Sequence, residues 1–540
     1  MKMYKNRKLS IYLPVLLSIV LAGGILIGLQ LNKSQGVTSS RSFHKKPDKL
    51  NGILNFIEAA YVDTVNIKDL EEVAIPKILE HLDPHSIYIP ARDFQRVNEP
   101  LEGNFDGIGV SFTMPNDTVI INSVISGGPS EKIGLAAGDR IIKINDKVVA
   151  GVKIHQDSIV KRLKGPRGTE VKVGISRSGV TETIDFTITR DKIPLYSVDV
   201  AYMVNDSTGY IKITKFARTT YHEFMDGLNS LKEKGMNQLI VDLRSNGGGY
   251  MDAAIKLANQ FLEDKTLIVY TQGRTQTREN FYADGSGNCK NGKIVILMDE
   301  YSASASEIVA GAIQDNDRGT IIGRRSFGKG LVQEPLMLSD GSAIRLTVAR
   351  YYTPTGRCIQ KPYNKGYDSY MHDLHDRFIN GEFEKADSIH FNDTLKYKTP
   401  KGKIVYGGGG IMPDVFIPID TTWATPYFVK VRNKGLIYKF AFEYSDKNRN
   451  LLESFKTPDK LKQHLESQHI YKQFNEYANK NGIPSTIQDK KESMHLISTQ
   501  IEAYTGRNIL DNAGFYPIWK DIDQTLLKAI DYISKPETMN

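Results

Sequence analysis

The chain has 540 residues, of which 40% are hydrophobic and 24% are charged, so it is too long for one hydrophobic core and too apolar to be disordered. Its formal net charge of +8 arises in residues 1–50, which carry nine basic side chains and one acidic side chain. Residues 51–540 are formally neutral, which argues against a nucleic-acid partner. Two cysteines, Cys289 and Cys358, are too few for a disulfide framework.

The first predicted element is an uncharged segment at 11–31, which follows a basic segment at 1–10. Its length, at about 1.5 Å per residue, matches the hydrocarbon core of a bilayer. Positive charge before such a segment keeps the N-terminus in the cytoplasm and places the body on the other side of the membrane. We therefore expect a single-pass anchor in the cytoplasmic (inner) membrane, with the body in the periplasm or outside the cell; a cleaved signal sequence is the alternative.

Two amphipathic helices are predicted next, in "LNGILNFIEAAYVD" and "LEEVAIPKILEHLD", and "DPHS" at 83–86 ends the second. From about residue 104, short apolar strands alternate with glycine-rich turns, as in a small β-rich module. The loop before its first apolar strand contains Gly107, Ile108, Gly109 and Val110. Backbone N–H groups of such a loop can bind a peptide carboxylate, although an ordinary glycine turn is the alternative.

Residues 206–352 alternate strand-like and helix-like segments, which predicts βαβ units and a largely parallel sheet. Active sites of such folds lie in the loops that follow the strands. Three small-residue loops occupy such places, "RSNGGGY", "YSASAS" and "RRSFGKG". We expect residues 360–405 to form a polar surface insertion and residues 419–540 to be helical.

Ser304 is a candidate nucleophile at the start of the helix in "SASASEIVAGAIQD". The alternative is purely structural, because Ser304 and Glu307 fit the S-x-x-E capping box. The free backbone N–H groups at this helix start, that of Ala305 in particular, would stabilise an oxyanion, and a glycine of "NGGG" would supply a second donor.

Lys329, in "SFGKGLVQEP", is the candidate base because none of the 11 histidines falls between residues 223 and 371. Burial in an apolar pocket lowers a lysine pKa and makes the neutral amine a base, and a Ser–Lys dyad needs no histidine. Gln333 lies on the same side as Lys329 if this segment is a strand. A surface lysine in a glycine turn is the alternative.

The chain resembles the C-terminal processing peptidases, or tail-specific proteases, from about residue 50 to 418. The resemblance rests on "YVD…LDPHS", "GGPSEKIGLAAGDRIIKIN", "VDLRSNGGG", "SASASEIVAGAIQD", "GRRSFGKGLVQ", "YYTPTGR" and "GGIMPD", in the family's order. It implies Ser304 as nucleophile, Lys329 as base, Gln333 as its helper, and the backbone of Ala305 and Gly248 as oxyanion donors. The family often has N-P-G-G where this chain has "NGGG".

The resemblance also implies an α/β fold with a ClpP/crotonase-like protease core, an inserted PDZ domain, and helical segments at both ends. The expected activity is that of a serine endopeptidase on unfolded polypeptides recognised by free C-termini, without metal or other cofactor. A non-catalytic PDZ adaptor and an acyl-CoA enzyme of the same sheet fold are alternatives, and the sequence leaves homo-oligomer formation and an adaptor partner open. The expected domains are 1–10 basic segment, 11–31 anchor or signal, 32–49 linker, 50–100 N-terminal helices, 101–190 PDZ domain, 191–418 protease core and 419–540 C-terminal helices.

Overall fold

The computed structural model describes residues 48–114, 117–125, 127–177, 179–390, 393–421 and 425–535. The chain divides into two compact units, Met1–Glu71 and Glu72–Asn540. In the described part, no helix has the length and apolar character that a bilayer crossing requires. The predicted membrane segment at 11–31 lies outside the described residues.

The first unit contains helix α2 (Lys49–Ala60) and the start of α3 (Ile67–Glu80), which coincide with the two predicted amphipathic segments. The carboxylate of Asp48 caps α2 by accepting a hydrogen bond from the Asn51 N–H at 3.2 Å. No residue of α2 is buried.

The second unit begins within α3 and continues through β1 (Ile87–Ile89) and α4 (Ala91–Glu102) into a β-rich domain. Antiparallel strands β2 (Asn104–Gly107) and β9 (Asp191–Pro194) form its entrance and exit. Its sheet has the order β3-β4-β5-β7-β8, with β6 on β5, and helices α5 and α6 accompany it. The bounds are β3 Val110–Thr113, β4 Val119–Val124, α5 Pro129–Lys132, β5 Arg140–Ile144, β6 Lys147–Val148, α6 Gln156–Leu163, β7 Glu170–Ser176 and β8 Ile184–Thr189.

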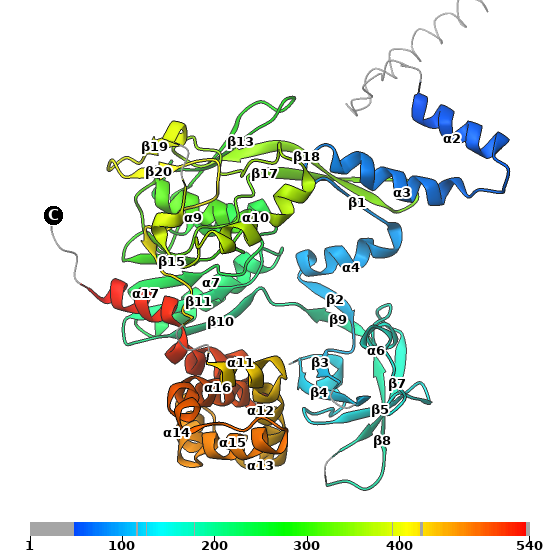
Figure 1. Ribbon diagram of the computed structural model, residues 1–540, viewed down its shortest axis with the longest axis vertical. Helices are drawn as coiled ribbons and strands as arrows, with labels where there is room; N and C mark the ends of the chain where they lie inside the picture. The colour runs from blue at the N-terminus through cyan, green and yellow to red at the C-terminus, as the bar shows by residue number, and fades with distance from the viewer. Residues whose placement is uncertain are drawn as a thin grey trace, which may run out of the picture. The chain divides into compact units, whose positions relative to one another are not determined.

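The central sheet of the α/β core has the order β10-β11-β12-β15-β16-β21 and is parallel except for β10 (Figure 1). This arrangement confirms the predicted βαβ pattern. The strands are β10 Val198–Met203, β11 Thr208–Ile213, β12 Gln238–Asp242, β15 Ile294–Met298, β16 Thr320–Gly323 and β21 Val415–Phe416; the helices are α7 Thr220–Glu233, α8 Met251–Asn259 and α9 Ala305–Asp315.

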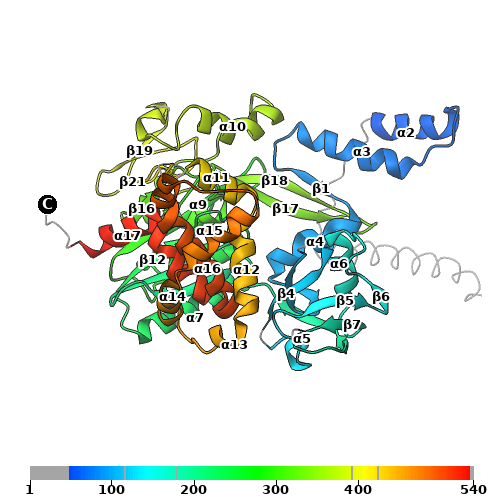
Figure 2. The ribbon, with the colours of Figure 1, turned by 60° about the horizontal axis from the view of Figure 1, so that its bottom comes forward.

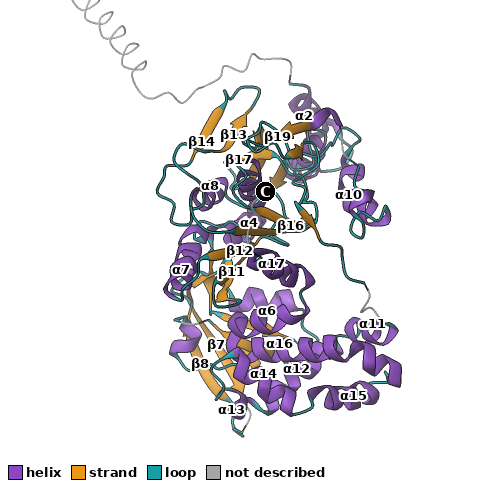
Figure 3. Ribbon diagram, turned by 90° about the vertical axis from the view of Figure 1, so that its left-hand side faces the viewer, coloured by secondary structure: helices purple, strands orange, loops and turns teal. Residues whose placement is uncertain are grey.

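Both faces of this sheet are covered, which is why its strands read as continuous apolar runs. Leu239 and Val241 of β12 pack with α7, α8 and α9, whereas Ile240 packs on the opposite face with Leu526 of helix α17 (Gln524–Ser534). Figure 3 shows α7 and α8 on one side of β11 and β12 and α17 on the other. Helix α17, the last described helix, therefore completes the core of the α/β domain.

A second, antiparallel sheet has the order β1-β18-β13-β14, with β17 paired to β18. The strand predicted at "TLIVYT" lies here as β13 and is not part of the parallel sheet, because it forms a hairpin with β14 and pairs with β18. The apolar pattern of a strand does not specify its neighbours, so this pairing was not predictable locally. The bounds are β13 Leu267–Gln272, β14 Glu279–Tyr282, β17 Leu331–Met337 and β18 Ala343–Tyr352.

The segment at 360–405 is more than the surface insertion that its composition predicts. It contains α10 (Tyr367–Ile379), the 3₁₀ turns η2 (Ala386–Ser388) and η3 (Asp393–Leu395), and the hairpin of β19 (Lys396–Lys398) and β20 (Ile404–Tyr406). Arg377 of α10 is buried and donates hydrogen bonds to the carbonyl oxygens of Arg325 and Ser326 at 2.8 and 3.1 Å. The insertion therefore supports the loop that carries Lys329.

The C-terminal region is helical, as predicted (Figure 2). It has a hydrophobic core of its own. Tyr427, Phe440 and Phe474 belong to this core, which joins helices α11, α12, α15 and α16. The helices are α11 Pro426–Asn433, α12 Leu436–Lys447, α13 Arg449–Leu452, α14 Pro458–Ser467, α15 Ile470–Lys480, and α16 Ile487–Trp519, followed by the turn η4 Lys520–Ile522 before α17. Cys289 and Cys358 are both free thiols.

Candidate active site

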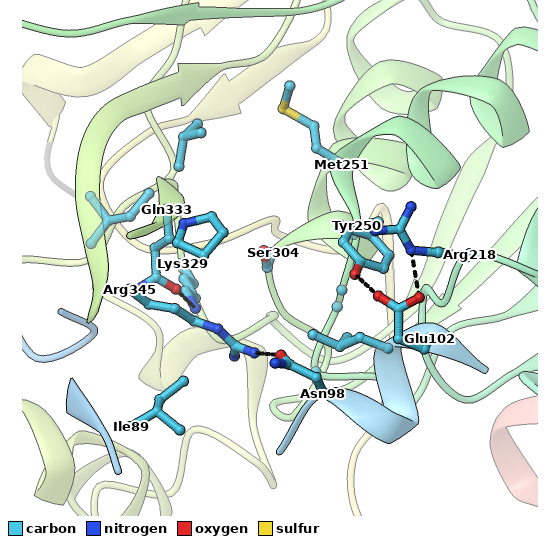
Figure 4. A pocket seen from close by; sticks show the side chains of 18 of the residues that line it. Ile89, Asn98, Glu102, Arg218, Tyr250, Met251, Ser304, Lys329, Gln333 and Arg345 are labelled. Atoms are coloured by element: carbon cyan, nitrogen blue, oxygen red, sulfur yellow. Dashed lines mark hydrogen bonds and ion pairs between the residues drawn. The ribbon is translucent and has the colours of Figure 1, made fainter. Parts of the chain in front are cut away.

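Three loops that follow the adjacent strands β12, β15 and β16 meet at one edge of the parallel sheet, as the sequence predicted. They carry the "NGGG" glycines, Ser304 and Lys329 respectively. With Gln333 of β17, these residues line one cleft of about 530 Å³ (Figure 4). The cleft also receives side chains from α4 and β18.

Ser304 has an unusual backbone conformation, with φ 56° and ψ −113°, between β15 and helix α9. A non-glycine residue at positive φ is strained, and such residues are concentrated at functional sites. Gly248 packs directly against it: a Cβ atom on Gly248 would lie 2.7 Å from the Ser304 Cβ and 2.8 Å from the Ala303 carbonyl oxygen. Only glycine permits this close approach of the two loops.

The other two serines of the "SASAS" run are buried structural residues. The Ser302 hydroxyl donates to the Leu243 carbonyl oxygen at 2.9 Å, and the Ser306 hydroxyl donates to the Asn246 carbonyl oxygen at 2.9 Å. They fasten the Ser304 loop to the loop after β12, while Ser304 between them is partly exposed in the cleft. The alternation of serine and alanine thus separates two structural hydroxyls from one that lines the cleft.

Lys329 is partly buried beside the strand that carries Gln333. Its Nζ donates to Gln333 Oε1 at 3.0 Å, and Gln333 Nε2 donates in turn to the carbonyl oxygen of His85. Burial lowers the pKa of Lys329, and the positive charge of Arg345 lowers it further, against the opposing carboxylates of Asp83 and Glu307. A lysine in this environment loses its proton more readily than an exposed one, as the predicted role of base requires.

Glu307 links the loop that carries Ser304 to the loop that carries Lys329. Its Oε2 accepts hydrogen bonds from the backbone N–H of Ser304 at 2.8 Å and of Lys329 at 2.9 Å. Its Oε1 accepts from the Ser326 hydroxyl at 2.5 Å and the Gly328 N–H at 2.7 Å. Burial raises the pKa of this carboxyl group. The capping-box pattern accounted for the bond to Ser304, but nothing in the sequence indicated the bonds to the second loop.

The "DPHS" segment, which the sequence predicted only as a helix end, positions Gln333. Asp83 accepts hydrogen bonds from the N–H groups of His85 at 2.8 Å and Ser86 at 2.9 Å, and from the Thr347 hydroxyl at 3.1 Å. The turn presents the His85 carbonyl oxygen to Gln333. The imidazole of His85 bonds to the Tyr370 hydroxyl at 2.7 Å, and burial and the charge of Lys329 lower its pKa to about 4. A neutral, engaged imidazole close to the site is therefore a structural group.

The two predicted oxyanion donors differ in whether their N–H groups already make a hydrogen bond. Ala305 N–H, at the start of α9, makes no hydrogen bond among the described residues. Gly248 N–H donates to Asn246 Oδ1 at 2.9 Å, so it would serve an oxyanion only by sharing or exchanging this bond. Both roles stay predictions.

An ionic cluster between Arg244 and Asp523 connects the "NGGG" loop to the C-terminal region. The Arg244 guanidinium donates to both carboxylate oxygens of Asp523, at 2.8 and 2.6 Å, and to Asp242 at 2.6 Å. Asp523 also caps helix α17 through the Leu526 N–H at 3.0 Å. The ionic cluster therefore connects the last helix of the chain to the strand end from which the "NGGG" loop departs.

In the β-rich domain, the predicted peptide-binding residues Ile108, Gly109 and Val110 line an apolar pocket of about 180 Å³ with Val160 and Leu163 of α6. Gly107 ends strand β2 directly before the loop. The pocket lies between the loop, the start of β3 and helix α6.

Family models match the two domains that the geometry distinguishes. Residues 207–366 match peptidase family S41, and residues 107–188 match the PDZ domain. Residues 427–511, in the C-terminal helices, match a family of unknown function. Over 346 residues, the chain is 36% identical to the carboxy-terminal-processing protease of Bartonella bacilliformis, covering 63% of this chain and 79% of that protein. It belongs to the carboxy-terminal processing proteases of peptidase family S41.

Two further proteins are similar to this chain. The carboxy-terminal processing protease CtpA of Bacillus subtilis is 34% identical over 358 residues, which cover 66% of this chain and 76% of that protein. The solved structure of a photosystem II D1 C-terminal processing protease is 24% identical, with a TM-score of 0.35, over 69% of this chain and 93% of that one. As a member of the family, this protease is a serine-type peptidase that carries a PDZ domain.

Proposed function

We propose that this carboxy-terminal processing protease is an exported serine endopeptidase that cleaves unfolded or C-terminally exposed polypeptides with a Ser304–Lys329 dyad. The observation that carries the proposal is the placement of Ser304, strained and partly exposed, in one cleft with a lysine whose pKa is lowered by burial. Lys361, another lysine of lowered pKa, is held in an ion pair with Asp373 at 2.7 Å and does not line this cleft.

The proposed reaction assigns a step to each of these groups. The neutral Lys329 amine takes the proton of the Ser304 hydroxyl as the oxygen attacks the substrate carbonyl, and the resulting ammonium gives the proton to the departing amine. Water then hydrolyses the acyl-enzyme with the same lysine as base. The Ala305 N–H at the positive end of α9 stabilises the oxyanion. Lys329 Nζ donates to Gln333 Oε1 in this structure, and a neutral amine that makes this bond keeps its lone pair to accept the Ser304 proton.

The PDZ pocket supplies the proposed recognition of the substrate's C-terminus. Val160→Asp places a charge in this apolar pocket and should slow cleavage of an unfolded protein with an apolar C-terminus about tenfold or more, since an unpaired charge there disfavours the bound chain. Val152→Asp, at a valine that is 51% exposed and outside the pocket, is the matched control. The measurement is kcat/KM of the full chain in mild detergent, and equal rates for the two variants would refute recognition through this pocket.

Export rests on the uncharged segment at 11–31 and the basic residues before it. We expect the full chain to remain in the membrane fraction after alkaline washing, with the body accessible to added protease from the non-cytoplasmic side. Protection of the body in intact cells with a permeable outer layer would contradict this topology.

A further inference from the structure

Arg345 is a charged residue of the cleft that the proposed dyad chemistry does not use as a reacting group. It lies on β18, opposite Pro335 of β17 in the sheet register, and its neighbour two residues earlier, Ala343, also lines the cleft. Alternate residues of a strand share a face, so β18 directs Arg345 to the catalytic side. Figure 4 shows its side chain extending from the Lys329–Gln333 side toward Asn98 of α4.

Within the described ranges of the chain, the Arg345 guanidinium has one hydrogen-bond partner, Asn98 Oδ1 at 2.7 Å. It forms no ion pair with any carboxylate among the described residues, although it is partly buried and burial lowers its pKa. The Asn98 amide nitrogen has no partner in the same part of the chain. A guanidinium has five N–H donors in a planar fork, so most of the Arg345 donors are left to bond a ligand in the cleft.

The other charges of the cleft do not compensate Arg345. Glu102 is paired with Arg218 at 2.8 Å and accepts a hydrogen bond from the Tyr250 hydroxyl at 3.0 Å. Lys329 adds a second positive charge when protonated and none when it acts as base. The described lining of the cleft therefore keeps one unpaired positive charge in the state that is competent for catalysis.

From this geometry we infer that Arg345 and Asn98 form a binding site for a carboxylate of the polypeptide substrate, inside the catalytic cleft and separate from the PDZ pocket. The inference rests on the proposed function, because it requires a polypeptide in the cleft. A carboxylate matches the guanidinium fork, restores its charge balance and accepts a bond from the Asn98 amide. Two sources offer this chemistry: the free C-terminal carboxylate, and an Asp or Glu side chain close to the scissile bond.

The two sources have different consequences for cleavage. If the terminal carboxylate binds at Arg345, the distance from Arg345 to Ser304 sets the number of residues between the chain end and the scissile bond. The protease would then release short C-terminal fragments of a fixed length. A bound acidic side chain instead selects internal sites next to Asp or Glu. In both cases Arg345 is a specificity residue that contacts substrate.

The test compares matched substrates in matched enzymes. One peptide pair differs only in a terminal carboxylate or amide, and a second, amidated series carries a single Asp or Asn at successive positions. The full chain is measured as wild type, Arg345→Gln, Arg345→Lys and Arg350→Gln; Arg350 is on the same strand but outside the cleft. For the member of each pair that carries the carboxylate, wild type should have a kcat/KM roughly ten- to hundredfold higher, the range of a charge-assisted hydrogen bond. Arg345→Gln should reduce the preference by about this factor, which leaves for the terminal pair only the part due to the PDZ domain.

Arg345→Lys should retain part of the preference, because it keeps the charge without the fork, and Arg350→Gln should retain all of it. The PDZ domain is the same in every enzyme, so the change in preference isolates the Arg345 site. If Arg345→Gln reduces the preference in the carboxylate/amide pair, the bound group is the terminal carboxylate. If it reduces the preference in an Asp/Asn pair, the bound group is an acidic side chain. Unchanged preferences in both series overturn the inference. If wild type hydrolyses no peptide, the proposed function fails instead, and the same comparison by fluorescence anisotropy, using Ser304→Ala and Ser304→Ala/Arg345→Gln proteins, still decides the carboxylate site.

Discussion

Replacing Ser304 by alanine is expected to lower kcat/KM for an unfolded protein substrate by several orders of magnitude and to leave the thermal midpoint almost unchanged. Loss of a nucleophile removes the covalent route and leaves only the small contribution of binding and oxyanion stabilisation. Alanine retains the backbone that starts α9 and its bond to Glu307, so little packing is lost. The measurements are steady-state hydrolysis by the full chain and thermal unfolding of the same preparations.

The neighbouring serines provide controls with the opposite result. Ser302→Ala and Ser306→Ala each remove a buried hydroxyl that donates to a backbone carbonyl oxygen of the loop after β12, which costs about 0.5–1.5 kcal/mol of stability. These variants should unfold at lower temperature but retain measurable hydrolysis. If Ser304 were only a helix cap, its replacement would cost about 1 kcal/mol and activity would survive, and the dyad would be wrong. An inactive wild type that still binds polypeptides would instead favour the adaptor alternative.

The plot of kcat/KM against pH is expected to have a rising limb that reports the deprotonation of Lys329. The base must be neutral, so kcat/KM increases as pH passes upward through the lysine pKa, which burial and Arg345 place below the ordinary value of 10.5. Lys329→Met should remove this limb and lower the rate by several orders of magnitude. Lys365→Met, at an exposed lysine, should leave both unchanged.

The charge of Arg345 provides a signed check on this assignment. Arg345→Gln removes a positive charge that disfavours the ammonium form of Lys329, so the pKa of Lys329 should rise and the limb should move to higher pH. A neutral peptide, for which the carboxylate site is irrelevant, is the appropriate substrate. A limb that persists in Lys329→Met would show that another group titrates and that Lys329 is not the base.

Much of the fold was predictable because its signals are local. The alternation of apolar strands and amphipathic helices predicted a parallel α/β core, and glycine-rich turns between short strands predicted the β-rich domain. The three loops after β12, β15 and β16 could be assigned to one sheet edge because the carboxyl ends of parallel strands lie together. That rule predicted that Ser304 and Lys329 lie on successive loops of one sheet.

The supports of the site were not predictable in this way. Glu307 reaches the Lys329 loop, and the Asp83 turn reaches Gln333, across long separations in sequence. The salt bridge from Asp523 to Arg244 depends on where the C-terminal helices pack, which composition does not specify. The polar composition of residues 360–405 predicted a surface insertion. Arg377 in this segment is nevertheless buried and donates hydrogen bonds to the carbonyl oxygens of Arg325 and Ser326, which its sequence does not indicate.

The sequence by itself determined which residues could carry the chemistry, because strand ends, helix starts and glycine turns follow from local preferences and steric limits. Only the tertiary structure decided how these residues are held and charged. The lowered pKa of Lys329 comes from burial and from Arg345 on β18, and the unpaired guanidinium in the cleft comes from the absence of any described carboxylate beside it. Burial and long-range electrostatic interactions are properties of packed neighbours, and packing alone brings those neighbours together.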